Sequence, residues 1–480
     1  MSEQTTHFKP SLGLLDATMV VAGSMIGSGI FIVSADITRH VGSAGWLIGV
    51  WVITGIMTVI AAVSYGELSS MYPKAGGQYV YLKEAFNPLV GFLYGWSFFA
   101  VIQTATIAAV GVAFARFTAY FIPAISEKNI LFQLGDSYKI SAAQIVSIAV
   151  IVLLTYINTK GIKTGKTIQT IFTSTKLLAL FGLIIFGFLL VKESFWDENW
   201  KTGFTAMQDF GNKDASGTLQ PVGWQSIAGV TVLGAIVASM TGSVFSSDAW
   251  NNVTFIAGEI KNPKRNVGLS LFLGTMIVSI IYITTNLMYL HVLPLNKVAF
   301  PQEDRLAVAA ASVIFGSAGR SIIAVLIMIS TFGCINGLVL AGARVYYTMS
   351  LDGLFFKKAG TLNQNAVPQW SLWAQCVVAA ILCLSGSYGQ LLDMISFVAV
   401  AFYVLTIMGI FILRKKQPDI ERPYKAFGYP FLPLLYILMG TTFCILLIIY
   451  KPSYTWPGLI ITLLGIPIYY MLVARKNPSR

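Results

Sequence analysis

Twelve long apolar segments follow one another along almost the whole chain, and they constrain the fold more than any other feature. A helix needs about 20 mostly apolar residues to cross the hydrocarbon core of a bilayer. Short polar connections separate the segments, and the longest lies near Lys192 to Gln225. The sequence therefore predicts an all-α polytopic membrane protein with 12 transmembrane helices. The expected spans are 12–38, 44–70, 88–120, 141–158, 167–191, 224–257, 267–293, 318–350, 371–388, 389–413, 429–450 and 454–474.

The composition excludes the other broad classes. Charged residues make up 11% of the chain, against about 25% in a soluble domain. Hydrophobic residues make up 56%, and the mean hydropathy is +0.72. The 31 Phe, 21 Tyr and 10 Trp exclude a disordered chain. Four cysteines are too few for a disulfide scaffold, and the polar segment Met1–Pro10 has no signal-peptide pattern.

The distribution of Lys and Arg predicts the orientation of the spans. If the N-terminus lies inside, the inner segments carry 20 Lys and Arg and 7 acidic residues. The outer segments then carry 11 Lys and Arg and 10 acidic residues. Cytoplasmic loops carry the excess of positive charge. We therefore expect a multi-pass plasma-membrane protein with both termini in the cytoplasm, and the net charge of +12 does not indicate nucleic-acid binding.

Four charged residues remain in or near the spans: Asp16, Lys176, Asp248 and Asp393. A charge at bilayer depth costs at least about 2.5–3.5 kcal/mol, so each is a candidate for function. For Asp16 we expect a position near the cytoplasmic interface. For Asp393 we expect the first turn of span ten, where the helix dipole favours an acid.

Lys176 follows Thr173–Thr175 and precedes an apolar run. If span five begins near Thr167, Lys176 lies about 13 Å deep, at about 1.5 Å per residue. If the helix begins later, the lysine snorkels to the cytoplasm. The sequence leaves both interpretations open.

Two spans carry polar or glycine-rich interruptions at matching positions. Span one contains Gly23–Phe31, in which five of nine residues are Gly or Ser, and span six contains Gly242–Ser247. Small-residue helix packing is one interpretation of such a motif. Broken helices in two five-helix halves instead predict a transporter with inverted repeats and a midplane site. Free N–H groups at Gly27, Ser28 and Gly29 suit a carboxylate, and the carbonyls near Met25 and Phe245 suit an ammonium group.

The chain resembles the amino acid–polyamine–organocation superfamily, and within it the bacterial relatives of the L-type amino acid transporter light chains. The resemblance covers essentially the whole chain. It rests on Gly23–Phe31, Tyr65–Leu68, Tyr72–Tyr81, Phe172–Leu180, Glu259–Arg265 and Ser330–Gly337, together with Arg344 and Asp352–Gly353.

The resemblance implies a LeuT-like fold of twelve helices with a five-plus-five inverted repeat and broken helices one and six. The first repeat would be 11–192 and the second 224–413, with helices eleven and twelve (429–474) outside the repeat. It also implies alternating access without a cofactor. The implied substrate-binding residues are Met25, Gly27, Ser28, Gly29, Phe245, Ser246 and Asp248, with Phe245 also an outer gate.

In this family the lysine that matches Lys176 occupies the place where sodium-coupled relatives bind an ion. Its implied neighbours are Gly23 and the span-eight residues Ser330, Thr331 and Cys334. A fixed ammonium there would either bridge helices one, five and eight or carry a proton. The sequence does not decide between these roles.

Some positions depart from the family pattern. Met25 replaces a common Ile, and Cys334 replaces a common Ser. The polar stretch Ser246–Ala249 favours small or polar neutral substrates. The loop 121–140 lacks the cysteine with which animal light chains bind a heavy chain, so we expect no disulfide-linked heavy chain.

The remaining groups of charged residues and histidines are weaker evidence for a functional site. Charged residues at the cytoplasmic ends of spans form either an inner gate of ion pairs or solvated helix ends. They are Glu67, Glu259, Arg265, Arg344 and Asp352. The three histidines, His7, His40 and His291, are too scattered for a metal or catalytic site.

We therefore expect a secondary amino acid transporter, either a sodium-independent exchanger or a proton-coupled carrier of small or polar neutral amino acids. One alternative is a cationic amino acid or polyamine antiporter in which Asp248 pairs with the substrate. An alternative of another class is a nutrient sensor that binds without transport. A membrane enzyme is the least favoured, because the spans lack clustered nucleophiles, acids or metal ligands.

Overall fold

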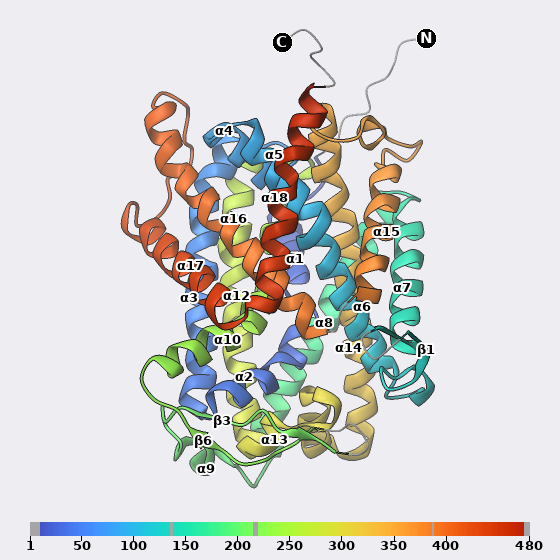
Figure 1. The fold of residues 1–480 in the computed structure, drawn as a ribbon, viewed down its shortest axis with the longest axis vertical. Coiled ribbons are helices and arrows are strands. Elements are labelled where there is room, and N and C mark those ends of the chain that lie inside the picture. Colours follow the sequence, from blue (N-terminus) through green and yellow to red (C-terminus); the bar gives the residue numbers. More distant parts are fainter. Residues whose placement is uncertain (1–9, 135–137, 215–218, 386–387, 475–480) are drawn as a thin grey trace.

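The computed structural model describes residues 10–134, 138–214, 219–385 and 388–474. Long helices run along the longest axis of the molecule as a bundle (Figure 1). Among the described residues, eight helical segments are long and apolar enough to cross a membrane. There are also four shorter apolar helices, of which the first precedes the long segments and the others lie between them: Leu14–Met25, Ala142–Asn158, Val230–Ser246 and Gln369–Leu384. The all-α membrane class is therefore confirmed.

The first five expected spans correspond to seven α-helices, because spans one and three are interrupted. A π-helical turn, Phe98–Ile102, interrupts span three. The helices are α1 (Leu14–Met25), α2 (Val33–Val41), α3 (Ala44–Met71), α5 (Pro88–Ser97), α6 (Gln103–Thr118), α7 (Ala142–Asn158) and α8 (Ile162–Leu190).

The next five expected spans begin with α10, which ends at Ser246 before a break. The helices are α10 (Val230–Ser246), α11 (Asn252–Phe255), α12 (Pro263–Val292), α14 (Leu306–Leu351), α15 (Gln369–Ser385) and α16 (Tyr388–Lys416). The last two spans are α17 (Phe431–Tyr450) and α18 (Pro452–Ala474).

Short elements cover the two ends of the bundle. The helix α4 (Gln78–Ala85) lies at the end where α18 finishes, whereas α9 and α13 lie at the opposite end (Figure 1). The remaining elements are α9 (Trp196–Trp200), α13 (Leu295–Ala299), and the strands β1 (Ile130–Leu134), β2 (Tyr138–Ser141), β3 (Met207–Gln208), β4 (Asn212–Lys213), β5 (Leu219–Gln220) and β6 (Gln225–Ser226). The strands form three two-stranded antiparallel pairs, β1–β2, β3–β6 and β4–β5.

Local sequence signals explain where several helices begin and end. Ser141 and Gln144 form a capping box at the start of α7. Asn87 caps α5, which has a proline in its first turn. Gly42 ends α2 with φ 55°, a left-handed conformation that glycine adopts without strain.

Polar and apolar side chains are distributed as in a membrane protein. Large apolar side chains such as Leu178, Leu189 and Leu438 are exposed on the outside of the bundle. Polar side chains such as Asn158 and Asn336 are buried and hydrogen-bonded to each other between α7 and α14. Lipid solvates the apolar surface, while buried polar groups need partners within the protein.

The structure corrects three expectations about the spans. The helix α14 begins at Leu306 rather than near residue 318, and it bends at Gly316, which has φ 70°. The helix α8 begins at Ile162, earlier than Thr167, so the interpretation in which Lys176 snorkels from a late start is wrong. Asp393 lies beyond the first turn of α16, and its Oδ1 accepts a hydrogen bond from Lys451 Nζ at 3.0 Å rather than capping the helix.

Candidate functional site

The break in span one exposes backbone groups in the middle of the bundle. The helix α1 ends at Met25, and Ile26 has φ −74° and ψ 89°, outside the helical region. The N–H of Gly27 turns back to Met25 O, while the N–H of Phe31 turns back to Ser28 O. Ser28 and Gly29 lie between these turns and are fully buried in the described structure.

Gly29 is required by close packing between the two broken spans. A Cβ atom at Gly29 would lie 1.9 Å from Ser246 Oγ, on the last turn of α10. At Gly27, a Cβ atom would lie 3.1 Å from Cys334 Sγ on α14. Glycine therefore lets the break in span one contact both α10 and α14.

Lys176 connects α8 to the break in span one. Its side chain is fully buried, and its Nζ donates to Gly23 O at 2.5 Å and to Ile26 O at 2.6 Å. Both acceptors are carbonyls at the end of α1, which the break releases from helical hydrogen bonding. The ammonium thus stabilises the carbonyl end of a half-helix, the end at which a cation is favoured.

The three span-eight residues expected near Lys176 lie on α14, which packs against both α1 and α8. Cys334 Sγ lies 3.7 Å from Ser24 O, next to the break. Thr331 donates its hydroxyl to Ile327 O within its own helix. Ser330 is buried, and within the described residues its Oγ has no hydrogen-bond partner.

The break in span six follows Ser246. Ala249 has φ 61°, a left-handed conformation that is uncommon for residues with a Cβ atom. This turn separates α10 from the short helix α11 and leaves Asp248 in the gap, with 7% of the residue exposed. The Asp248 carboxylate accepts a short hydrogen bond from Tyr403 on α16.

Tyr282 joins the two breaks directly. Its hydroxyl lies 3.0 Å from Met25 O and 3.0 Å from Ser246 O, the last residues of α1 and α10. Both carbonyls lie at the ends of interrupted helices, where a backbone acceptor needs a new donor. The α12 side chain therefore holds the two half-helices at a fixed separation.

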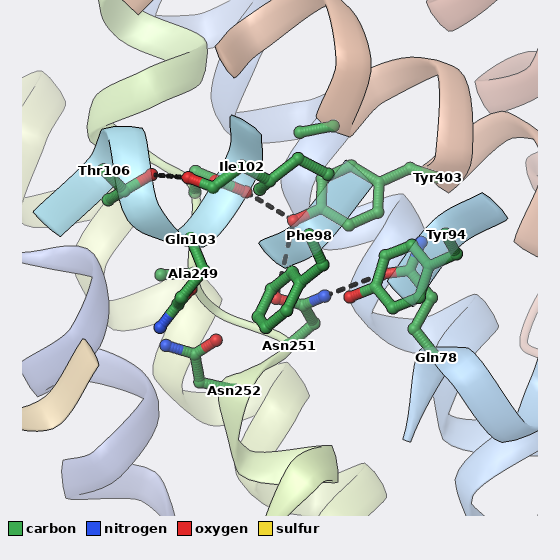
Figure 2. Close-up of a pocket in the computed structure, with 12 residues that line it drawn as sticks. Gln78, Tyr94, Phe98, Ile102, Gln103, Thr106, Ala249, Asn251, Asn252 and Tyr403 are labelled. Carbon is green, nitrogen blue, oxygen red and sulfur yellow. Dashed lines mark hydrogen bonds between the residues drawn. The ribbon is translucent and has the colours of Figure 1, made fainter. Parts of the chain in front are cut away.

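A narrow cavity lies beside Asp248 (Figure 2). Its free space is about 10 Å³, which has room for one water molecule. Asn251 lies between Gln78 and Tyr403, donating to Gln78 Oε1 at 2.8 Å (Figure 2). The aromatic rings of Tyr94 and Phe98 line the same space. In this conformation the cavity is too small for an amino acid.

Phe245 on α10 and Tyr388 on α16 contact each other through their rings. Their rings meet edge to face, with centroids 6.1 Å apart. The Tyr388 hydroxyl lies 3.0 Å from Ser28 Oγ, so Tyr388 contacts the span-one break as well as Phe245. Phe245, expected as an outer gate, therefore lies in a closed contact between α10 and α16.

Comparison with known proteins identifies the family. The model of the amino acid permease family matches residues 12–473. The chain belongs to the amino acid permease family. Family membership confirms the expected resemblance and makes this protein an amino acid transporter.

Curated relatives align with the permease over nearly its whole length. It is 29% identical to the serine/threonine exchanger SteT of Bacillus subtilis, over 99% of this chain and 100% of that one. It is 26% identical to the mouse Asc-type amino acid transporter 1, over 100% of this chain and 84% of the relative. It is also 26% identical to the mouse large neutral amino acids transporter small subunit 2, over 96% of this chain and 81% of the relative.

Four of the five residues expected at an inner gate form buried or half-buried ion pairs in the permease. Arg344 Nε lies 3.6 Å from Glu259 Oε1, and both side chains are almost fully buried. Asp352 accepts from Lys83 Nζ at 2.6 Å and from the Tyr79 hydroxyl at 2.8 Å.

The fourth of these residues, Glu67, forms a bidentate pair that the sequence did not predict. Arg414 donates to its two carboxylate oxygens at 3.0 and 2.7 Å. The Ala426 N–H donates to the same carboxylate at 2.7 Å. Arg265 lies apart from these pairs, because it is exposed at the start of α12 and forms no ion pair within the described residues.

Sequence analysis missed the residues that complete the site from distant spans, above all Tyr282, Tyr388, Tyr403 and Arg414. Only the charge of Arg414 and the position of the tyrosines within expected spans set them apart in the sequence. Tyrosine at a buried position usually finds a hydrogen-bond partner, which is the one signal that could have drawn attention to them.

All four cysteines are free thiols in the permease. Cys334, Cys376 and Cys383 are buried, and Cys444 is half-buried. Within the described residues, no group of three or more His, Cys, Asp or Glu is placed to hold a metal ion. His7 and both chain ends lie outside the described residues.

Proposed function

We propose that this permease is a sodium-independent exchanger of small or polar neutral amino acids that works by alternating access. The observation that carries the proposal is the pair of facing helix breaks with a buried lysine at one of them. Ser28 and Gly29 offer N–H groups at the start of a half-helix, where a substrate carboxylate is favoured. The α-amino group would lie near the carbonyls of Met25 and Phe245, at the ends of α1 and α10.

Sodium independence follows from the position of Lys176. Its ammonium already donates to Gly23 O and Ile26 O, two carbonyls of the kind that coordinate a sodium ion. A second cation at the same carbonyls would meet a fixed positive charge a few ångströms away. At this depth the repulsion is poorly screened by water.

The size of the substrate follows from the surroundings of the breaks. Gly29 packs directly on Ser246, and Cys334 packs against Gly27. The wall formed by Ser246–Asp248 is polar. A short polar side chain fits these surroundings better than a large apolar one, in agreement with the serine/threonine exchange named for the relative SteT.

The test is counterflow in proteoliposomes. Vesicles preloaded with unlabelled serine should accumulate labelled serine from a sodium-free buffer, whereas empty vesicles should accumulate far less. A screen of the twenty amino acids as competitors would then give the substrate range. Absence of exchange with every amino acid would contradict the proposal, and steep dependence on sodium would contradict the role of Lys176.

A cationic substrate is a second candidate because of Asp248. Its hydrogen-bond partner is the Tyr403 hydroxyl, and within the described residues it forms no ion pair. A substrate with a basic side chain could supply the missing positive charge. Competition by arginine or putrescine that disappears in Asp248→Asn would favour this candidate over the neutral one.

We also propose twelve spans, with repeats 11–192 and 224–413, helices 429–474 outside them and both termini in the cytoplasm. The excess of Lys and Arg on the connections at the α4 end supports this orientation. The same proposal includes no disulfide-linked heavy chain, in keeping with four cysteines that are buried or half-buried. Labelling of single cysteines with an impermeant reagent would test the orientation, with Glu127→Cys expected to react from outside and Lys357→Cys only after permeabilisation.

A further inference from the structure

A second cavity lies on the outer side of the contact between Phe245 and Tyr388. Its volume is about 180 Å³, and a cavity of about 150 Å³ is large enough to bind benzene. It is lined by residues that follow the span-one break, Ile32 and Val33, and by Gly242, one turn before Phe245. In this conformation the outer cavity has room for a small amino acid, whereas the cavity at Asp248 does not.

The outer cavity is lined by three basic and three acidic side chains from five different parts of the chain. A cavity of this size lined by balanced charges is suited to a ligand that carries both signs, since each charge of the ligand meets its opposite. The charged lining residues are Asp36, Arg39, Arg116, Asp304, Asp393 and Lys451.

Four of these six side chains already neutralise one another. Arg39 Nη1 donates to Asp304 Oδ1 at 2.8 Å and to Ala299 O at 2.7 Å. Lys451 Nζ donates to the two oxygens of Asp393 at 3.0 and 3.3 Å. These two pairs fix the walls of the cavity.

Arg116 and Asp36 are the two charged lining residues outside these pairs. The Arg116 guanidinium donates through Nε to Glu127 at 3.0 Å and lies 5.5 Å from the centre of the Tyr388 ring. Asp36 has a side chain that is 45% exposed, and its contacts to Arg39 and His40 are 3.5 and 3.6 Å long. Within the described residues the Arg116 guanidinium bonds to Glu127 through Nε, which leaves its two Nη groups for a ligand. The half-exposed Asp36 carboxylate can likewise accept from a ligand.

We propose that this outer cavity is a docking site for a zwitterionic amino acid, with Arg116 binding the carboxylate and Asp36 binding the ammonium group. The proposal rests on the proposed exchange function. Tyr388 connects the outer cavity to the span-one break, because its ring contacts Arg116 and its hydroxyl contacts Ser28. When Tyr388 moves away from Phe245, the carboxylate can pass from the Arg116 guanidinium to the N–H groups at Ser28 and Gly29.

The outer cavity lies on one side of the Phe245–Tyr388 contact. Variants that weaken amino acid binding in this cavity should therefore affect transport from that side alone. Arg116→Gln should raise the KM for serine uptake into intact cells about tenfold, the effect of losing one charge-assisted hydrogen bond. Asp36→Asn should raise the same KM. The KM measured in inverted membrane vesicles, where substrate enters from the cytoplasmic face, should stay at the wild-type value for both variants.

Two control variants separate docking from folding. Lys297→Gln removes an exposed positive charge at the same end of the bundle, outside the cavity, and should leave both KM values unchanged. Arg116→Lys keeps the positive charge and should lie closer to the wild type than Arg116→Gln. Equal changes of KM on the two faces, or an unchanged outer KM in Arg116→Gln, would overturn the docking site. Failure of the wild type to exchange any amino acid would instead overturn the proposed function.

Discussion

Replacing Lys176 by methionine tests the central feature of the site. Methionine keeps most of the length of the side chain and removes its charge and its hydrogen-bond donors. The carbonyls of Gly23 and Ile26 would lose donors at 2.5 and 2.6 Å. A buried acceptor left without a partner costs about 1–3 kcal/mol, so the two together cost about 2–6 kcal/mol.

This cost falls on one conformation of span one. A difference of about 1.4 kcal/mol changes an equilibrium tenfold, so the population with the observed break should fall at least tenfold. Loss of the buried charge also removes a desolvation penalty, which offsets part of this cost. We therefore expect Lys176→Met to reduce serine counterflow at least tenfold, with sodium giving no rescue.

The assay needs a matched control on the same helix. Thr175→Val changes the adjacent residue, whose hydroxyl bonds to Ile171 O within α8 and is exposed. It should retain wild-type counterflow, and gel filtration should give the same profile for both variants. Full counterflow in Lys176→Met would refute the proposal that the hydrogen bonds of this lysine connect α8 to the span-one break.

Three further predictions concern other contacts. Tyr282→Phe removes the hydroxyl between Met25 O and Ser246 O and should lower the maximal exchange rate about fivefold, the equivalent of about 1 kcal/mol. Breaking the buried pair at Glu67 costs about 3–5 kcal/mol, so Glu67→Ala should lower the unfolding temperature clearly, whereas Glu421→Ala, which removes an exposed pair with Lys264, should barely change it. Burial raises the pKa of Asp209 in the loop before α10, but hydrogen bonds from three backbone N–H groups outweigh it and hold the pKa below 3.8. A lowered folded-state pKa stabilises the fold above the unfolded value and loses this effect as pH falls through the folded one. The unfolding temperature should therefore fall more steeply below pH 3.8 in the wild type than in Asp209→Asn, and equal slopes would contradict this assignment.

The breaks illustrate what local sequence can reveal. Glycines at 23, 27 and 29, within an apolar segment, predict weakened helix, and the structure has a break there. The sequence left two interpretations of Lys176 open, a position deep in the span and a snorkelling one. Its snorkelling alternative was excluded only when α8 was seen to begin at Ile162.

Asp393 shows where local reasoning fails, and Arg265 shows where it leaves two alternatives open. At Asp393 the helix dipole was the best local explanation, yet Lys451 on the connection between α17 and α18 supplies a stronger interaction. At Arg265 the sequence left an inner gate and a solvated helix end open, and the side chain is exposed at the start of α12. The side chain that a neighbouring span brings into contact is not encoded in a local pattern.

The sequence by itself determined the membrane class, the family and the two breaks, because apolar length and glycine content act within a single helix. The partners of the buried groups depended on the tertiary structure. Glu67 and Arg414 are separated by 347 residues, and Tyr403 reaches Asp248 across 155. A buried polar group must find a partner in three dimensions, and the partner is whichever side chain the packing of the spans brings within hydrogen-bond distance.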